Sequence, residues 1–147
     1  MSGPHMMIIT DFNRKFSEAK GGNTSGTIFG GPFYTSPHGY KLKMRVNLNE
    51  TREQYKDHMR VYIYVVKSEH DAILSWPFKK KYTFTLIDQQ DNEQERNNIV
   101  KTLTPKEQNR PKDKENEGRG CVISHKTLLT RKYIKDDTVF ITVSIEQ

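Results

Sequence analysis

The sequence GYKLKMRVNL, residues 39–48, alternates polar and apolar side chains along its length. Its apolar positions are Leu42, Met44, Val46 and Leu48, and the polar positions between them include Arg45. A period of two places alternate side chains on opposite faces of a β-strand. One face can then be buried while the other contacts water, as is common in antiparallel sheets. The stretch therefore predicts a half-buried antiparallel strand with the charge of Arg45 on its solvent face.

Seven further segments have the composition of short strands, at residues 7–12, 27–29, 59–66, 82–87, 99–103, 121–123 and 138–145. The only helix we expect is a single turn at residues 125–129, capped by Ser124. About eight strands with almost no helix, and no alternation of strands and helices, predict an all-β fold. We expect an eight-stranded antiparallel β-sandwich.

The segments between these strands predict exposed connections. Residues 13–24 are polar and end in a turn signal, and Gly30-Gly31-Pro32 predicts the end of a strand. Residues 68–71 predict a turn with solvated carboxylates, and residues 72–78, which are rich in large apolar side chains, predict a plug of the core. Residues 104–119 lack apolar side chains and predict a long, exposed and mobile loop.

The chain has 147 residues and a net charge of +6. Residues 1–6 resemble an addition left by cloning, so we expect a single domain at residues 7–147 that is a fragment of a longer protein. The positive charge permits an acidic partner. The basic residues are interspersed with acidic ones, which weakens the case for nucleic acid.

The sequence offers little for catalysis or metal binding. Cys121 is the only cysteine, so it cannot form an internal disulfide, and its presence alone fits a reducing compartment. The histidines have no ligand spacing, and no glycine-rich phosphate loop is present. No apolar run approaches the ~18–20 residues of a membrane helix. We therefore expect neither an enzyme nor a membrane-inserted protein, with no metal or cofactor.

Several short motifs occur in a characteristic order, at residues 32–35, 39–42, 76–78, 88–89 and 133–138. Together they resemble the C-terminal TRAF (MATH) domain of the tumour necrosis factor receptor-associated factors, from about Ile9 to Ile145. The resemblance implies an eight-stranded antiparallel sandwich, which agrees with the strand count above. It also implies a cytoplasmic signalling adaptor that binds short extended peptides of receptor tails or signalling partners. The full-length protein would be a homotrimer, and this fragment a monomer or weak trimer.

The resemblance also implies a peptide site. Such a peptide adds as a strand at a sheet edge. Arg45 matches a family arginine that meets the acidic or aromatic end of the peptide, and Tyr62 matches an aromatic residue that lines the groove. Asn47 stands where some members have a tyrosine. The edge that receives the peptide would be residues 118–123, in which the candidate site residues are Gly118, Arg119, Gly120 and Cys121.

Two other classes of function stay open, one from the resemblance and one from the residues. The domain could be a structural or self-association module whose peptide groove is altered, because the edge lacks the aromatic residues that family members often carry there. Basic residues interleaved with tyrosines near residues 60–64 and 79–82 are also compatible with single-stranded nucleic acid. Nucleic-acid binding would show a steep dependence on salt.

Overall fold

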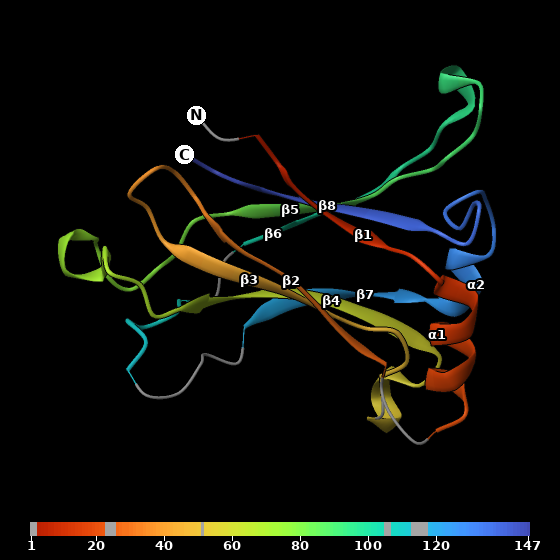
Figure 1. The fold of residues 1–147 in the computed structure, drawn as a ribbon, viewed down its shortest axis with the longest axis horizontal. Helices are drawn as coiled ribbons and strands as arrows, with labels where there is room; N and C mark the ends of the chain where they lie inside the picture. Colours follow the sequence, from red (N-terminus) through yellow and green to blue (C-terminus); the bar gives the residue numbers. More distant parts are fainter. Residues whose placement is uncertain (1–2, 23–25, 51, 105–106, 113–117) are drawn as a thin grey trace.

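The computed structural model describes residues 3–22, 26–50, 52–104, 107–112 and 118–147, and in this part of the chain it contains eight strands in two sheets. One sheet has the order β1-β8-β5-β6 and the other β2-β3-β4-β7, with all neighbours antiparallel. The sheets face each other as two layers (Figure 1). The strands are β1 (His5–Ile9), β2 (Thr27–Tyr34), β3 (Lys41–Asn47), β4 (His58–Val66), β5 (Tyr82–Leu86), β6 (Ile99–Leu103), β7 (Arg119–Ser124) and β8 (Val139–Ile145). The predicted sandwich is confirmed.

The core lies between the two inner faces. Leu42, Met44 and Val46 of β3 are fully buried, as are Val61 and Ile63 of β4. The opposite layer contributes Phe84 and Val143, among others. Each of these strands alternates in the register that the sequence predicts. Burial of large aliphatic side chains of this kind stabilises a fold by about 1.5–3 kcal/mol for each side chain.

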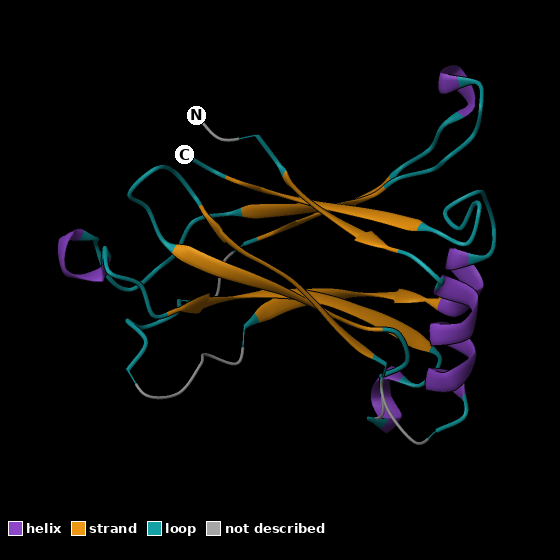
Figure 2. Ribbon diagram, viewed as in Figure 1, coloured by secondary structure: helices purple, strands orange, loops and turns teal. Residues whose placement is uncertain are grey.

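Helix α1 (Phe12–Lys20) corrects one expectation, because the polar segment after β1 is helical rather than a loop. Phe12, Phe16 and Ala19 are spaced so that they share one face of the helix, and all three are buried. The helix lies across one end of the sandwich (Figure 2). The second helix, α2 (His125–Leu128), agrees with the predicted turn, and Ser124 Oγ accepts a hydrogen bond from the Thr127 amide at 3.0 Å.

Strand β2 does not end at its Gly-Gly-Pro segment, as the sequence predicted. It continues to Tyr34, and its pairing with β3 shifts register between Gly30 and Phe33. A β-bulge absorbs such a shift without ending the strand. At the start of the chain, His5 and Met6 pair with Val143 and Thr142 of β8, so part of segment 1–6 takes part in the sheet.

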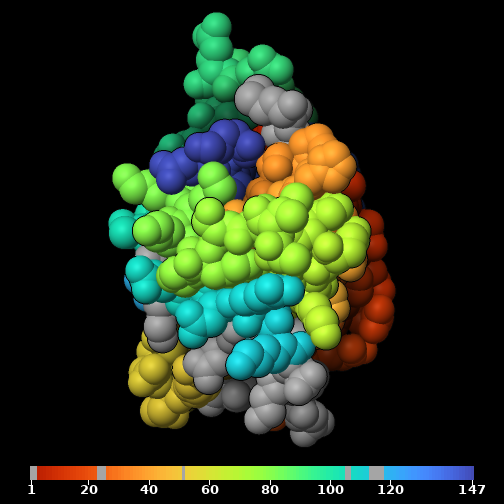
Figure 3. Space-filling model, turned by 90° about the vertical axis from the view of Figure 1, so that its left-hand side faces the viewer, coloured from red at the N-terminus to blue at the C-terminus, as the bar shows by residue number. Residues whose placement is uncertain are grey.

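Residues 107–112 follow the expected exposed loop only in part, because Gln108 and Pro111 are buried while the other four residues are exposed. The backbone of Gln108 pairs with that of Phe78, and its side-chain Oε1 accepts a hydrogen bond of 3.0 Å from the Val65 amide. Figure 3 shows the end of the sandwich where segment 107–112 lies beside segment 67–75. Of the two carboxylates predicted to be solvated, Glu69 is exposed, whereas Asp71 is only 2% exposed and its Oδ2 accepts a hydrogen bond from the Ser68 amide at 3.0 Å. The rest of the predicted mobile loop, residues 105–106 and 113–117, lies outside the described residues.

Two 3-10 turns lie on loops beside β4, η1 (Glu53–Tyr55) before it and η2 (Asp71–Ile73) after it, and a third, η3 (Glu93–Glu95), lies between β5 and β6. In the predicted core plug at residues 72–78, Phe78 is fully buried, but Ile73 in η2 is 78% exposed, so only part of this segment fills the core. Trp76 is partly buried against the core and donates its indole N–H to the Asp71 carbonyl at 2.9 Å. The loops at this end are therefore fixed by specific hydrogen bonds.

Candidate functional site

Strand β7 forms one edge of its sheet. Its residues pair with β4 from Arg119 opposite Ile63 to Ser124 opposite His58, and among the described residues β7 has no second strand partner. An edge strand directs alternate backbone N–H and C=O groups away from its sheet, where another extended chain can pair with them. The predicted receiving edge is therefore an edge in the structure.

Two glycines permit β7 to approach β4 closely. A Cβ atom at Gly120 would lie 1.9 Å from the Val61 carbonyl oxygen and 2.3 Å from the Tyr62 Cβ. At Gly118 it would lie 2.5 Å from the Ile63 carbonyl oxygen, and the backbone there has φ +84°. Such contacts and dihedrals are accessible only to glycine.

One row of residues crosses the outer face of this sheet to the edge. Phe29, Arg45, Tyr62 and Gly120 are direct cross-strand partners on β2, β3, β4 and β7. The guanidinium carbon of Arg45 lies 5.5 Å from the Phe29 ring centroid and 5.4 Å from that of Tyr62. The structure thus brings together three of the residues predicted from sequence, and places Arg45 between two aromatic rings.

Arg45 has an unusual environment for a cation. Its Nε atom is buried and has no hydrogen-bond partner, and within the described ranges no carboxylate forms an ion pair with its side chain. The two rings give cation–π stabilisation of about 0.5–2 kcal/mol. They leave the hydrogen-bonding capacity of the guanidinium group unused, and an anionic ligand could supply that missing partner.

Tyr62 faces outward as predicted, but its side chain is not open to solvent. It is only 4% exposed, with the guanidinium groups of Arg45 and Arg60 against its ring. Burial raises the pKa of Tyr62, and the charges of the two arginines oppose that rise. A ligand on this face would therefore meet the arginines before it meets the ring.

Asn47 lies in the next row toward the end of the sheet, and it too is buried. Its Oδ1 accepts a hydrogen bond of 2.8 Å from the Thr27 hydroxyl, and its Nδ2 donates one of 3.2 Å to Glu50 Oε2. Its amide is thus engaged within the domain. Asn47 positions Glu50 rather than presenting a free amide to a ligand.

Arg119 and Cys121 lie on the other face of β7. They pair with Ile63 and Val61, which face the core, and Cys121 packs against that core. Burial raises the pKa of Cys121 to about 11, so the thiol stays protonated at neutral pH. These two residues can contribute their backbone to the edge, whereas their side chains are on the opposite side from Arg45.

Arg60 was not among the predicted peptide-site residues, although the basic and aromatic pattern of residues 60–64 had been considered for nucleic-acid binding. Its guanidinium carbon lies 4.4 Å from the Tyr62 ring centroid, and its NH1 atom lies 4.0 Å from Glu50 Oε2. The signal was available in the alternation of β4, in which Arg60, Tyr62 and Tyr64 share the outer face. The stacking on Tyr62 depends on side-chain conformation, which that pattern does not contain.

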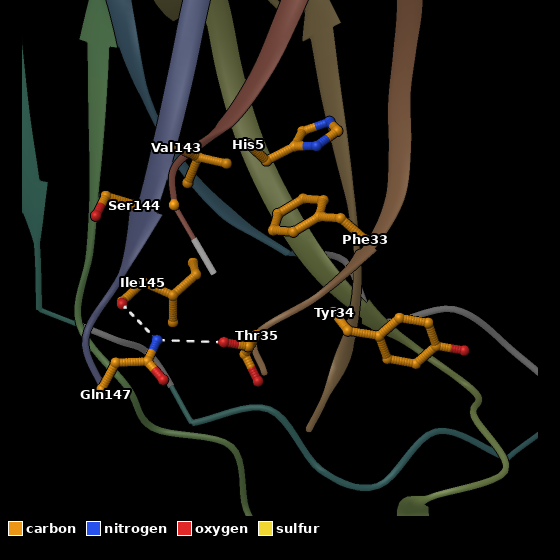
Figure 4. A pocket seen from close by; sticks show the side chains of 9 residues that line it. His5, Phe33, Tyr34, Thr35, Val143, Ser144, Ile145 and Gln147 are labelled. Carbon is orange, nitrogen blue, oxygen red and sulfur yellow. Dashed lines mark hydrogen bonds between the residues drawn. The ribbon is translucent and has the colours of Figure 1, made fainter. Parts of the chain in front are cut away.

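The remaining features of the described residues give weaker candidates. No group of three or more His, Cys, Asp or Glu side chains there could hold a metal ion. The pocket in Figure 4, where the His5 ring stacks on Phe33 and Gln147 bonds to the Thr35 carbonyl, has a volume of about 20 Å³. That is room for a water molecule only. In the described part of the chain, no helix is long and apolar enough to cross a membrane.

Comparison with known proteins agrees with this architecture. Residues 26–142 match the sequence model of the family described as TRAF/meprin, MATH domain. TNF receptor-associated factor 5 of Mus musculus is 37% identical over 153 residues, covering 99% of this chain and 27% of the relative. TNF receptor-associated factor 1 of Homo sapiens is 32% identical over 148 residues, covering 98% of this chain and 35% of the relative. The chain thus spans about a third or less of the length of these curated relatives.

A solved structure is similar over nearly the whole chain. TRAF5 of Notothenia coriiceps superposes with a TM-score of 0.84 at 30% sequence identity, covering 99% of this chain and 73% of that one. The relatives are named as receptor-associated factors and not as enzymes. From the sequence model, the relatives and the shared fold together, the chain belongs to the TRAF/meprin MATH domain family.

Proposed function

We propose that this domain is a cytoplasmic signalling adaptor module that binds short extended peptides of receptor tails or signalling partners. The peptide adds as a strand to the free edge of β7, and its side chains contact the outer face of the sheet, which determines specificity. The relatives are TNF receptor-associated factors, and this supports receptor tails as the source of the peptide.

The environment of Arg45 is the observation that carries this proposal. Its guanidinium group lies between Phe29 and Tyr62 without a carboxylate partner in the described residues. The row that contains it ends at Gly120, which has no side chain to block an incoming group. A peptide carboxylate that enters over Gly120 gives the partly buried guanidinium a charge-assisted hydrogen bond.

The other predicted residues have distinct roles in this proposal. Gly118, Arg119, Gly120 and Cys121 offer their backbone to the peptide strand. The Tyr62 ring packs against the Arg45 guanidinium, and Asn47 holds Glu50 in place. In a trimer of the full-length protein, three weak sites would act together on clustered receptor tails and raise the overall affinity.

The test is a titration of fluorescently labelled Pro-x-Glu-x-x-(acidic or aromatic) peptides, followed by fluorescence anisotropy up to millimolar concentration. A millimolar Kd corresponds to about 4 kcal/mol. We expect saturable binding by the wild type, and at least about tenfold weaker binding by Arg45→Glu, because the anchor then repels the peptide acid. Lys132→Glu, a charge reversal in the exposed loop after α2, is the control for net charge and should bind normally.

Circular dichroism must show that each variant is folded. If no peptide binds to the folded wild type, the proposal is wrong, and sedimentation velocity would then test the self-association alternative. Binding that Arg45→Glu leaves undiminished would instead remove the assigned role of Arg45.

A further inference from the structure

The second arginine on the outer face, Arg60, lies closer to the free edge than Arg45 does. Arg60 is on β4, next to the edge strand, whereas Arg45 is one strand further in on β3. Strands in a sheet are spaced by about 4.8 Å. A peptide strand on β7 would therefore approach the row of Arg60 more easily than the row of Arg45.

Arg45 and Arg60 lie in adjacent rows on the same outer face of the sheet. Arg45 is opposite Tyr62 and, through it, Gly120, whereas Arg60 is opposite Val122. Rows on one face of a strand are separated by two residues, about 6.8 Å. In an added strand, the side chains opposite Gly120 and Val122 both point to the outer face and are also two residues apart.

The charges on this face are not balanced. Arg45 has no carboxylate in the described residues, and Arg60 shares only Glu50, at 4.0 Å. The Glu50 carboxylate also accepts the Asn47 hydrogen bond. A guanidinium group has five N–H donors, so one carboxylate at that distance leaves most of the capacity of Arg60 unused. A single peptide acid could satisfy only one of the two cations fully.

We infer that the groove is selective for peptides that carry two acidic side chains separated by one residue, with Arg45 and Arg60 each contacting one of them. This inference rests on the proposed addition of a peptide to β7. It names Arg60 as a residue that determines specificity. Tyr62 has a supporting role, because its ring fixes both guanidinium groups.

Three labelled peptides with a common extended frame test the spacing. Their central residues are Glu-Thr-Glu, Glu-Glu-Thr and Glu-Thr-Thr. In an extended strand the first peptide has two acids on one face, the second has two acids on opposite faces, and the third has a single acid. We expect Glu-Thr-Glu to bind the wild type about tenfold more tightly than the other two, the effect of one added charge-assisted hydrogen bond. Fluorescence anisotropy at fixed ionic strength gives the three affinities.

Variants of the second cation complete the test. Arg60→Gln should bind all three peptides alike, and Arg60→Lys should recover part of the preference. Glu50→Gln removes the competing carboxylate and should strengthen Glu-Thr-Glu binding. Thermal unfolding shows whether each variant is folded.

The possible outcomes separate this inference from the proposal on which it rests. If Glu-Thr-Thr binds in a way that depends on Arg45, while Glu-Thr-Glu and Glu-Glu-Thr bind equally, the groove exists and the two-acid inference is wrong. A preference for Glu-Thr-Glu that survives in Arg60→Gln also overturns it. Failure of all three peptides to bind the folded wild type overturns both.

Discussion

Arg131 and Arg45 show how the same side chain can serve two purposes in one domain. Arg131, between α2 and β8, donates its Nε–H to the fully buried Asp88 at 2.7 Å and its NH2 group to the Glu95 carbonyl at 2.6 Å. Arg45 lies on strand β3 between two aromatic rings and has no carboxylate partner among the described residues. The first cation is satisfied within the fold, and the second has its unused donors on a face beside a free edge.

The outer faces of the two sheets differ in the same way. The row Met6, Thr142, Thr85 and Val100 crosses β1, β8, β5 and β6 without a charge. The corresponding row of the other sheet contains Arg45. Both sheets bury an apolar inner face, so the inner faces account for the fold. The proposed peptide site lies on the outer face that contains Arg45.

The largest effect that we expect is a loss of stability when the ion pair between Arg131 and Asp88 is removed. Arg131→Ala leaves the buried Asp88 carboxylate without its cation, and it should lower the free energy of unfolding well beyond experimental error. Peptide affinity should not change. Urea unfolding measures the loss, with Lys132→Ala, the exposed neighbour, expected within about 0.5 kcal/mol of wild type. An equally small change in Arg131→Ala would show that other groups satisfy Asp88.

A smaller loss is expected at the open edge. Gly120→Val places a Cβ 1.9 Å from the Val61 carbonyl oxygen, so β7 must move away from β4. We expect a loss of about 2 kcal/mol in stability together with loss of peptide binding. Thr85→Val, on the uncharged outer face of the other sheet, should change neither by much. Peptide binding by a folded Gly120→Val at wild-type affinity would argue against strand addition at β7.

Sequence alone predicted the sandwich well, because alternation is a local property. The strand containing Leu42, Met44 and Val46 has the predicted faces, and all eight expected strands are present in the described residues. Helix α1 was missed because its buried face has only three apolar positions, Phe12, Phe16 and Ala19, within a polar segment. Their spacing of four and three residues was the available signal.

The candidate site was predictable only in part. The outward direction of Arg45 and Tyr62 follows from the period of two, but the row that joins them to Phe29 and Gly120 depends on strand register. No local pattern gives that register. For the same reason the sequence did not show that Arg45 and Arg60 would cover Tyr62, or that Asn47 would bond to Glu50.

The smallest effect that we expect is on the pH dependence of stability. It should differ between Arg131, which pairs with Asp88, and Arg45, which has no carboxylate partner in the described residues. Burial on its own would raise the pKa of Asp88, but hydrogen bonds from Arg131 and the Asn97 amide outweigh burial and hold the pKa below its ordinary value. A carboxyl with a lowered pKa in the folded state stabilises the fold above its unfolded pKa, about 3.9, and this contribution is lost as the pH falls through the folded value.

Asp88→Asn should therefore be less stable than the wild type at neutral pH, and the difference should shrink below about pH 4. Urea unfolding from pH 7 to pH 2.5 measures it. Arg45→Ala should keep a constant difference from the wild type over this range, because within the described residues Arg45 has no carboxylate to lose. If the difference in free energy of unfolding between Arg45→Ala and wild type disappeared in acid, Arg45 would have an internal acidic partner. That result would weaken the argument that its charge is directed to a ligand.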